Sequence, residues 1–327
     1  MGWDPGAECP AITRLPVPDD IYDDLRNRLR RLATVVDSAH TAHQNNPVWV
    51  AEEEEVLKIF IVPEFYFRPP MLDYVAFTAY THNVWNQYRA AIDGLFTDDS
   101  FRNWFFVCGT IVFAGDPDSY SSRNTTCNAL VVKQGGPNRP PACIVQKSAT
   151  SNIDGMTIYE MPELAGVDYK NSVPVWSSPI NQPHRTLNIC GVSIGMEVCL
   201  EHSKQVLRRL MVGRRVGTLD ICLHLLIAGG MLVNDASVTT RRGKYILRND
   251  GLYQPGREAV ELFQVSDYQS TLLGVMTNKS RAVRGVALMC ARTIPVPPGA
   301  RLQLPPSVVN DVTYDQDILI YNSLDIR

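Results

Sequence analysis

The sequence predicts an α/β protein, in which helices cover buried β-sheets. Nine short runs rich in apolar or β-branched residues are spread along the chain, and long segments of helical periodicity separate some of them. The runs are apolar on both faces, which is typical of strands that are covered on both sides. We therefore expect helices on one side of a sheet and a second sheet on the other.

Three helices follow from periodicity and from start signals. The first covers residues 19–43, opens with two Asp and places Leu, Arg and Ala at helical spacing. The second covers residues 71–96 and begins after the sequence "RPP", because proline favours the first turn of a helix. The third covers residues 201–212, where Glu201, His202 and Lys204 lie at helical spacing and indicate a charged helix.

The nine runs predict strands that belong to one domain. They cover residues 57–62, 104–113, 127–132, 142–146, 187–194, 219–227, 244–248, 271–276 and 285–290. No Gly/Ser-rich linker, low-complexity tract or internal repeat divides the sequence, so residues 1–327 are expected to form a single domain. Residues 291–327 are proline-rich and then apolar. This extension is predicted either to contact a partner subunit or to pack on its own domain.

Composition and charge narrow the class of protein. The 327 residues are 45% hydrophobic and 20% charged, which is close to the average of soluble globular proteins. A formal net charge of -3 gives no general attraction to nucleic acid or to an anionic membrane, so neither is expected as a partner. The eight cysteines form no CxxC pair, and the N-terminal segment lacks the pattern of a secretory signal. A cytoplasmic protein with reduced thiols is expected.

The first polar residue after three of the buried runs forms a coherent chemical set. The run "LKIFIVPE" ends in Glu64, "ACIVQK" ends in Lys147 and "GVSIGMEVC" ends in Cys199. A thiol is nucleophilic as its thiolate, which Glu64 can generate by accepting the proton and Lys147 can stabilise by its charge. The same ammonium can stabilise the oxyanion that forms when the thiolate attacks a C=O or C≡N carbon.

These residues carry a resemblance to a known family. The segments "IFIVPEFYF", "IVQKSATSNID" and "GVSIGMEVCLEH" resemble the three signature blocks of the nitrilase superfamily, the carbon-nitrogen hydrolases, in the family's order of Glu, Lys and Cys. The separations, from 64 to 147 and from 147 to 199, also suit that family. The segment "TTCNALVVKQGG" resembles the family's strand that carries an Asn and then turns at Gly. The resemblance extends over residues 57–227.

The resemblance implies a four-layer αββα sandwich that pairs into a homodimer or a higher homo-oligomer and hydrolyses nonpeptide C–N bonds without a metal or organic cofactor. Carried over by position, Glu64 would be the general base, Lys147 the oxyanion partner and Cys199 the nucleophile. The backbone N–H of Leu200 would be the second oxyanion donor. Many members carry a second Glu after the Lys; here Asp154 stands seven residues on, and Glu160 is the alternative.

The substrate is expected to be a small amide or carbamoyl compound, with nitrile hydrolysis or N-acyl transfer as alternatives on the same three residues. Tyr66 and Tyr159 are candidates for an aromatic pocket wall, and Arg68 is a candidate for binding a substrate carboxylate. Two other classes stay open. One is a Cys/His hydrolase of another fold, with His202, His184 or His224 as the base. The other is a catalytically inactive assembly scaffold.

Overall fold

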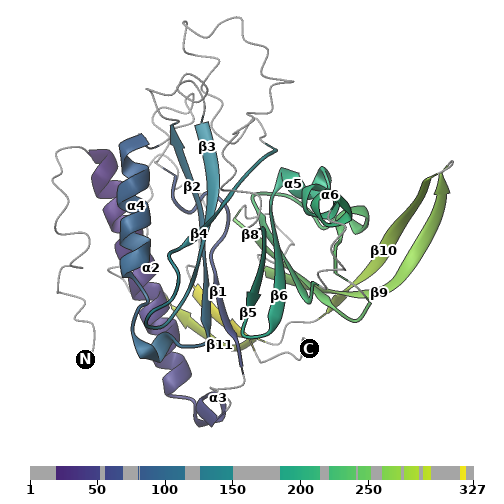
Figure 1. Cartoon of the computed structure of the whole chain (residues 1–327). Coiled ribbons are helices and arrows are strands. Elements are labelled where there is room, and N and C mark those ends of the chain that lie inside the picture. The colour runs from purple at the N-terminus through teal and green to yellow at the C-terminus, as the bar shows by residue number, and fades with distance from the viewer. Residues whose placement is uncertain are drawn as a thin grey trace, which may run out of the picture.

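The computed structural model describes most of the chain, with gaps. The described residues are 20–51, 56–68, 80, 82–114, 126–149, 185–213, 221–240, 242–251, 260–273, 276–286, 290–295 and 317–321. They form a mixed α/β protein with two main sheets, as the sequence predicts (Figure 1).

The first sheet has four strands in the order β1-β2-β3-β4. They are β1 (Lys58–Ile61), β2 (Trp104–Ala114), β3 (Thr126–Gln134) and β4 (Cys143–Gln146). β1 runs parallel to β2, and the other neighbours are antiparallel. All four coincide with predicted runs, because their apolar residues are needed on both faces of a covered sheet.

The second sheet has six strands in the order β10-β9-β8-β7-β6-β5. They are β5 (Thr186–Ile189), β6 (Val192–Val198), β7 (Leu223–Ala228), β8 (Tyr245–Asp250), β9 (Val260–Leu273) and β10 (Met276–Val286). β6, β7 and β8 are parallel, and β9 and β10 form a long antiparallel pair that extends away from the rest of the molecule (Figure 1). The single run predicted over residues 187–194 is in fact β5 and β6. Cys190 and Gly191, with φ of 50° and 79°, turn the chain between them.

The two sheets pack face to face through a shared apolar cluster. It contains Phe105 and Val107 of β2, Leu130 and Val132 of β3, Val145 of β4, Ile194, Met196 and Val198 of β6, and Leu223, Leu225 and Ile227 of β7. These side chains alternate along each strand, as the two-residue period of a β-strand requires. The expected second sheet behind the first is therefore present.

Helices cover the other face of the four-stranded sheet. α2 (Asp20–Gln44) and α4 (His82–Gly94) lie side by side against it (Figure 1). The short helix α3 (Pro47–Ala51) follows α2 along the chain, and a 3-10 turn at Asp99–Phe101 follows α4. Leu25, Leu29 and Leu32 of α2 and Tyr88 and Ile92 of α4 are buried in one cluster with β2 and β3. α2 matches the helix predicted over residues 19–43.

The second and third helix predictions were wrong in their extent. Tyr80 forms a β-bridge with Phe113, so α4 cannot include it and begins at His82; residues 71–79 of the prediction lie outside the described residues. The predicted helix 201–212 is two helices, α5 (Leu200–Ser203) and α6 (Val206–Gly213). Gln205 separates them because its φ of 56° is incompatible with a right-handed helix.

A β-bulge in β2 changes which side chains face the second sheet. The register with β3 shifts between Val107 and Thr110, where Gly109 has a φ of 76°. Before the bulge, Phe106 and Cys108 face the helices, whereas Ile111 and Phe113 do so after it. A Cβ on Gly109 would lie 2.7 Å from the carbonyl oxygen of Pro63, so only glycine fits there. The bulge thereby accommodates the chain just before Glu64.

The described part of the C-terminal extension packs on its own chain. β11 (Cys290–Pro295) pairs with β12 (Asp317–Tyr321), and Ile318 of β12 is buried against Val35 and Ala39 of α2. Contact with a partner subunit stays a prediction, and so does the expectation that residues 1–327 form a single domain.

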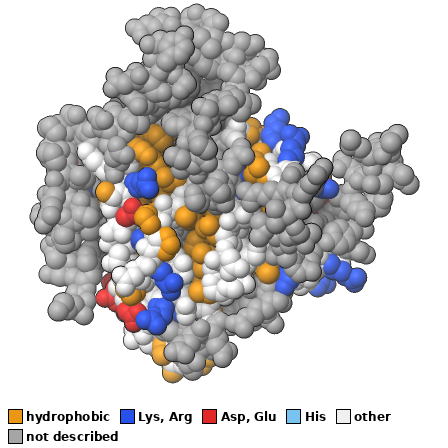
Figure 2. Space-filling view, in the orientation of Figure 1, with side chains coloured by type: hydrophobic (Ala, Val, Ile, Leu, Met, Phe, Trp, Pro, Cys, Tyr) orange, Lys and Arg blue, Asp and Glu red, His pale blue; other side chains and the backbone are white. Residues whose placement is uncertain are grey.

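The described surface shows no long apolar helix. None of the helices in the described part of the chain is long and apolar enough to cross a membrane. On the face drawn in Figure 2, the described Lys and Arg side chains form separate groups, with apolar patches between them. The six cysteines whose side chains are described are free thiols.

We expect the cluster between the sheets to dominate stability. Leu225→Ala should lower the free energy of unfolding by about 2–5 kcal/mol, because Leu225 is fully buried there and its truncation leaves a cavity. Leu232→Ala is the control; its side chain is 46% exposed, and the change should stay within about 0.5 kcal/mol. Urea unfolding measures both. Equal effects would contradict the packing described.

Candidate active site

Glu64, Lys147 and Cys199 come together at one end of the cluster between the two sheets. Lys147 directly follows β4 and continues the alternation of Val145, so it faces the second sheet. Asn128 on β3 shares a face with Leu130 for the same reason. Cys199 directly follows β6 of the facing sheet. The site is therefore built between the sheets and at the ends of their strands.

Glu64 and Lys147 form a fully buried ion pair. Lys147 Nζ lies 2.8 Å from Glu64 Oε1, and both side chains are 0% exposed. Asn128 Nδ2 donates a second hydrogen bond to Glu64 Oε1 at 2.9 Å, and the backbone carbonyl of Asn128 accepts from the backbone N–H of Lys147 at 2.8 Å. Asn128 thus positions both charged residues. Buried charges need such partners, because desolvation otherwise disfavours them.

The backbone of Cys199 departs from the strand that precedes it. Its φ of 48° and ψ of -112° lie outside the β region. By alternation Cys199 would share the outer face of β6 with Glu197, but the turn brings it into the inner cluster beside Val198. The Cys199 N–H donates to the Ile227 carbonyl at 2.8 Å, and its own carbonyl accepts from the His202 N–H at 2.9 Å. These bonds hold a conformation that costs free energy.

The thiol of Cys199 is protonated in the resting site. Burial raises its pKa first, and the negative charge of Glu64 and the hydrogen bond with Glu64 raise it further. The positive charge of Lys147 and a hydrogen bond with the Gly229 backbone oppose this, and the pKa is raised to about 12. The resting state is therefore a thiol facing a carboxylate that can accept its proton.

Gly229 and Phe65 pack closely around this group. A Cβ on Gly229 would lie 2.8 Å from Glu64 Oε2 and 2.9 Å from the Phe65 ring, so a larger residue would displace the carboxylate. Phe65 has a φ of 63°, and its N–H donates to Thr110 Oγ1 at 2.8 Å. Two cations lie near the ring of Phe65: Lys147 Nζ is 5.8 Å and the Arg68 guanidinium carbon 4.9 Å from its centroid.

The other predicted site residues fall in three positions. The Leu200 N–H begins α5 beside Cys199, and none of the described residues accepts a hydrogen bond from it. Tyr66 is buried in the cluster under α2, where its hydroxyl accepts from Arg31 Nη1 at 2.9 Å; these contacts do not join it to the three residues of the site. Asp154, Tyr159 and Glu160 lie outside the described residues, so their roles stay predictions.

Sequence reasoning missed a buried charged clamp next to the site. Glu201, two residues after Cys199, is 0% exposed and forms a bidentate pair with Arg185, with two distances of 2.6 Å. Its Oε1 also accepts from the N–H of Ser148 at 2.5 Å. Helical spacing of charges indicated an exposed position, and only the adjacency of Glu201 to the nucleophile could have suggested otherwise.

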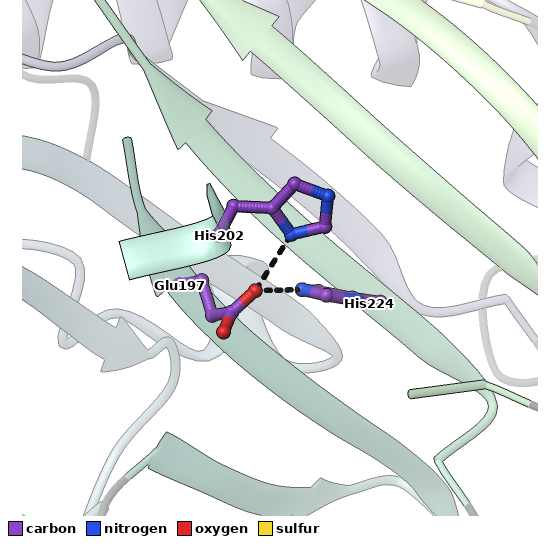
Figure 3. A group of neighbouring side chains, drawn as sticks. All are labelled: Glu197, His202 and His224. Atoms are coloured by element: carbon purple, nitrogen blue, oxygen red, sulfur yellow. Dashed lines mark hydrogen bonds and ion pairs between the residues drawn. The ribbon is translucent and has the colours of Figure 1, made fainter. Parts of the chain in front are cut away.

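A second buried cluster lies on the outer side of β6 (Figure 3). Glu197 Oε2 lies 2.7 Å from His202 Nδ1 and 3.1 Å from His224 Nε2, and all three side chains are 0% exposed. Glu197 Oε1 accepts from the Leu207 N–H at 2.6 Å. Burial raises the pKa of Glu197, but hydrogen bonds from the two histidines outweigh it and lower the pKa to about 2.

These three residues have donor atoms that a metal ion could use, but their hydrogen bonds fix another arrangement. The Asn234 N–H donates to His202 Nε2 at 3.0 Å, so the proton of a neutral His202 ring is on Nδ1 and points at Glu197. A metal ion on Nδ1 would require removal of that proton. The cluster is therefore a hydrogen-bond network, and both ring nitrogens of His202 are occupied by partners other than Cys199.

Comparison with known proteins identified no matching family model and no matching curated protein.

We expect Glu64→Gln to lower the pKa of the Cys199 thiol. The neutral amide removes the negative charge that disfavours the thiolate, while Lys147 stays, so the pKa should fall from about 12 by about 1 to 3 pH units. The pH dependence of Cys199 alkylation, followed by peptide mass spectrometry, measures this. Exposed Cys190 in the same samples gives the reagent's own pH dependence. An unchanged or raised pKa would contradict the geometry.

Proposed function

We propose that this chain is a cysteine-dependent hydrolase of nonpeptide C–N bonds, acting as an amidase, with a sandwich of the nitrilase type. The observation that carries the proposal is the convergence of Glu64, Lys147 and Cys199 in one buried site. Each came from the end of a different predicted strand, and they supply a base, a cation and a nucleophile.

Acylation follows from the positions of these groups. Glu64 accepts the Sγ–H proton as the thiolate attacks the carbonyl carbon of the amide. The oxyanion is stabilised by the Lys147 ammonium and by the Leu200 N–H. When the C–N bond breaks, the protonated Glu64 returns the proton to the leaving amine, and a thioester on Cys199 remains.

In deacylation, water takes the place of the thiol as the nucleophile, and Glu64 is again the base. Glu64 takes a proton from a water molecule as the resulting hydroxide attacks the thioester carbon, and the same donors stabilise the second oxyanion. Collapse expels the thiolate, which recovers its proton from Glu64, and the carboxylic acid leaves. The raised pKa of the free thiol fits this cycle, because the nucleophile is needed as a thiolate only during attack.

The arrangement of layers supports the nitrilase-type fold within this proposal. α2 and α4 cover the four-stranded sheet, the six-stranded sheet packs behind it, and α6 lies against β6 on the far side. Leu207 of α6 packs so closely on Gly195 of β6 that a Cβ there would lie 2.8 Å from Leu207 Cδ2. The layers thus follow one another as helix, sheet, sheet and helix, which is the order expected of an αββα sandwich.

The substrate we propose is a small linear amide or carbamoyl compound. An amide gives the thioester directly, whereas a nitrile gives a thioimidate that must add water before it loses ammonia. The described residues contain no group that compels the second route. His202, the histidine nearest to Cys199 in the sequence, is bound to Glu197 and to the Asn234 N–H, which disfavours a Cys/His enzyme.

We expect Cys199→Ala to abolish turnover and to leave the fold intact, because the small buried thiol is replaced by a side chain of similar polarity. Ammonia release from matched pairs of amides and nitriles measures activity, and intact-protein mass spectrometry detects an acyl adduct on the wild-type chain. Cys190→Ala is the control and should keep full activity, because Cys190 is exposed. A wild-type chain that releases ammonia from none of these compounds would favour the scaffold, and adducts from nitriles alone would contradict the amidase.

Lys147→Ala should lower kcat by about 10² or more if the ammonium stabilises the oxyanion. Steady-state kinetics on the best amide give kcat and KM separately. Lys133→Ala is a matched control, because Lys133 is also buried but its Nζ lies 4.0 Å from Asp93 Oδ1. A change in KM alone would make Lys147 a substrate-binding residue instead.

A further inference from the structure

The Glu201 carboxylate accepts more hydrogen bonds than is usual for a carboxylate on a surface helix. Its Oε1 accepts from the Ser148 N–H at 2.5 Å, from Ser148 Oγ at 2.9 Å and from Arg185 Nη2 at 2.6 Å. Its Oε2 accepts from Arg185 Nη1 at 2.6 Å and from the Val198 N–H at 3.0 Å. These donors satisfy both oxygens of the fully buried carboxylate, and Arg185 is its ion-pair partner.

The partners of Glu201 are the chain neighbours of two site residues. Ser148 directly follows Lys147, and Val198 directly precedes Cys199. Arg185 Nη2 also donates to the carbonyl of Gln146, at 2.7 Å, so the clamp holds the backbone on both sides of Lys147. β4 and β6 belong to different sheets. One carboxylate therefore bridges the two sheets at the point where the ammonium and the thiol meet.

We propose that Glu201 is a positioning residue that sets the separation of Lys147 from Cys199, with Arg185 as its counter-ion. The expected effect of Glu201 on turnover rests on the proposed function, whereas its expected effect on the reactivity of the Cys199 thiol does not. The positive charge of Lys147 favours the Cys199 thiolate, and that influence falls with distance. Small displacements between catalytic groups also cost large factors in rate.

Glu197 provides a matched comparison. It is equally buried and stands two residues before Cys199, as Glu201 stands two residues after it. Its carboxylate contacts His202 of α5 and His224 of β7 (Figure 3), and it also accepts from the Leu207 N–H of α6. None of them reaches β4. Glu197 therefore anchors the helices to the second sheet without acting on Lys147.

The test compares Glu201→Gln with Glu197→Gln. The amide keeps the size of Glu201 but removes its charge and turns two N–H donors toward groups that are themselves donors. We expect the rate of Cys199 alkylation at fixed pH to fall at least tenfold and kcat to fall about 10²-fold, with KM changed less than threefold. Glu197→Gln should lower Tm but change the alkylation rate and kcat less than threefold per folded molecule.

A double-mutant cycle separates positioning from general destabilisation. In a Lys147→Met background, Glu201→Gln should no longer change the alkylation rate of Cys199, because the charge that it positions is absent. If Glu201→Gln fails to fold, Ser148→Ala removes the hydroxyl that donates to Glu201 and accepts from Arg185, and it should shift alkylation in the same direction by a smaller factor.

Two results would overturn the proposal. One is a Glu201→Gln variant that loses Tm but keeps the alkylation rate; the other is an equal effect with and without Lys147. If no amide or nitrile is turned over by the wild-type chain, the proposed function fails while the alkylation data still decide the role of Glu201.

Discussion

The burial of the Glu64–Lys147 ion pair is the constraint on which the site depends. Two charges removed from water are tolerated only where hydrogen bonds and close packing replace the solvent. Asn128 supplies the hydrogen bond to Glu64, and Gly229 lets the neighbouring strand end approach the carboxylate. The bulge at Gly109 serves the same need from the other side, because it admits the chain that carries Glu64. Asn128, Gly229 and the bulge at Gly109 belong to separate strands or strand ends, but all three serve the Glu64–Lys147 ion pair.

The nucleophile is held by polar residues on both sides of its turn. Cys199 has a backbone conformation that strand and helix both disfavour, and such conformations persist only where the surroundings over-determine them. Glu201 accepts from the N–H of Val198 before Cys199, and the N–H of His202 after it donates to the Cys199 carbonyl. A turn that is fixed on both sides keeps the thiol on the inner face, where it meets a group from the opposite sheet.

The sequence located the three site residues because apolar runs end where strands end. Glu64 and Lys147 are the first charged residues after such runs and Cys199 directly follows another, and β-strand alternation then decides which face a side chain occupies. The same reasoning failed for Glu201 and His202, which are buried although charge at helical spacing favours solvent. It also could not find the break at Gln205, because its left-handed backbone has no glycine or proline to mark it.

The packing of Ile318 on Val35 and Ala39 has a consequence for how the chain folds. Residues so distant in sequence make contacts of high contact order, and such contacts form late because the closure of a long loop must precede them. During synthesis, the apolar residues of α2 that contact β12 stay uncovered until residues 317–321 have been made. β12 is therefore a late cover of α2, and its removal would expose an apolar surface prone to aggregation.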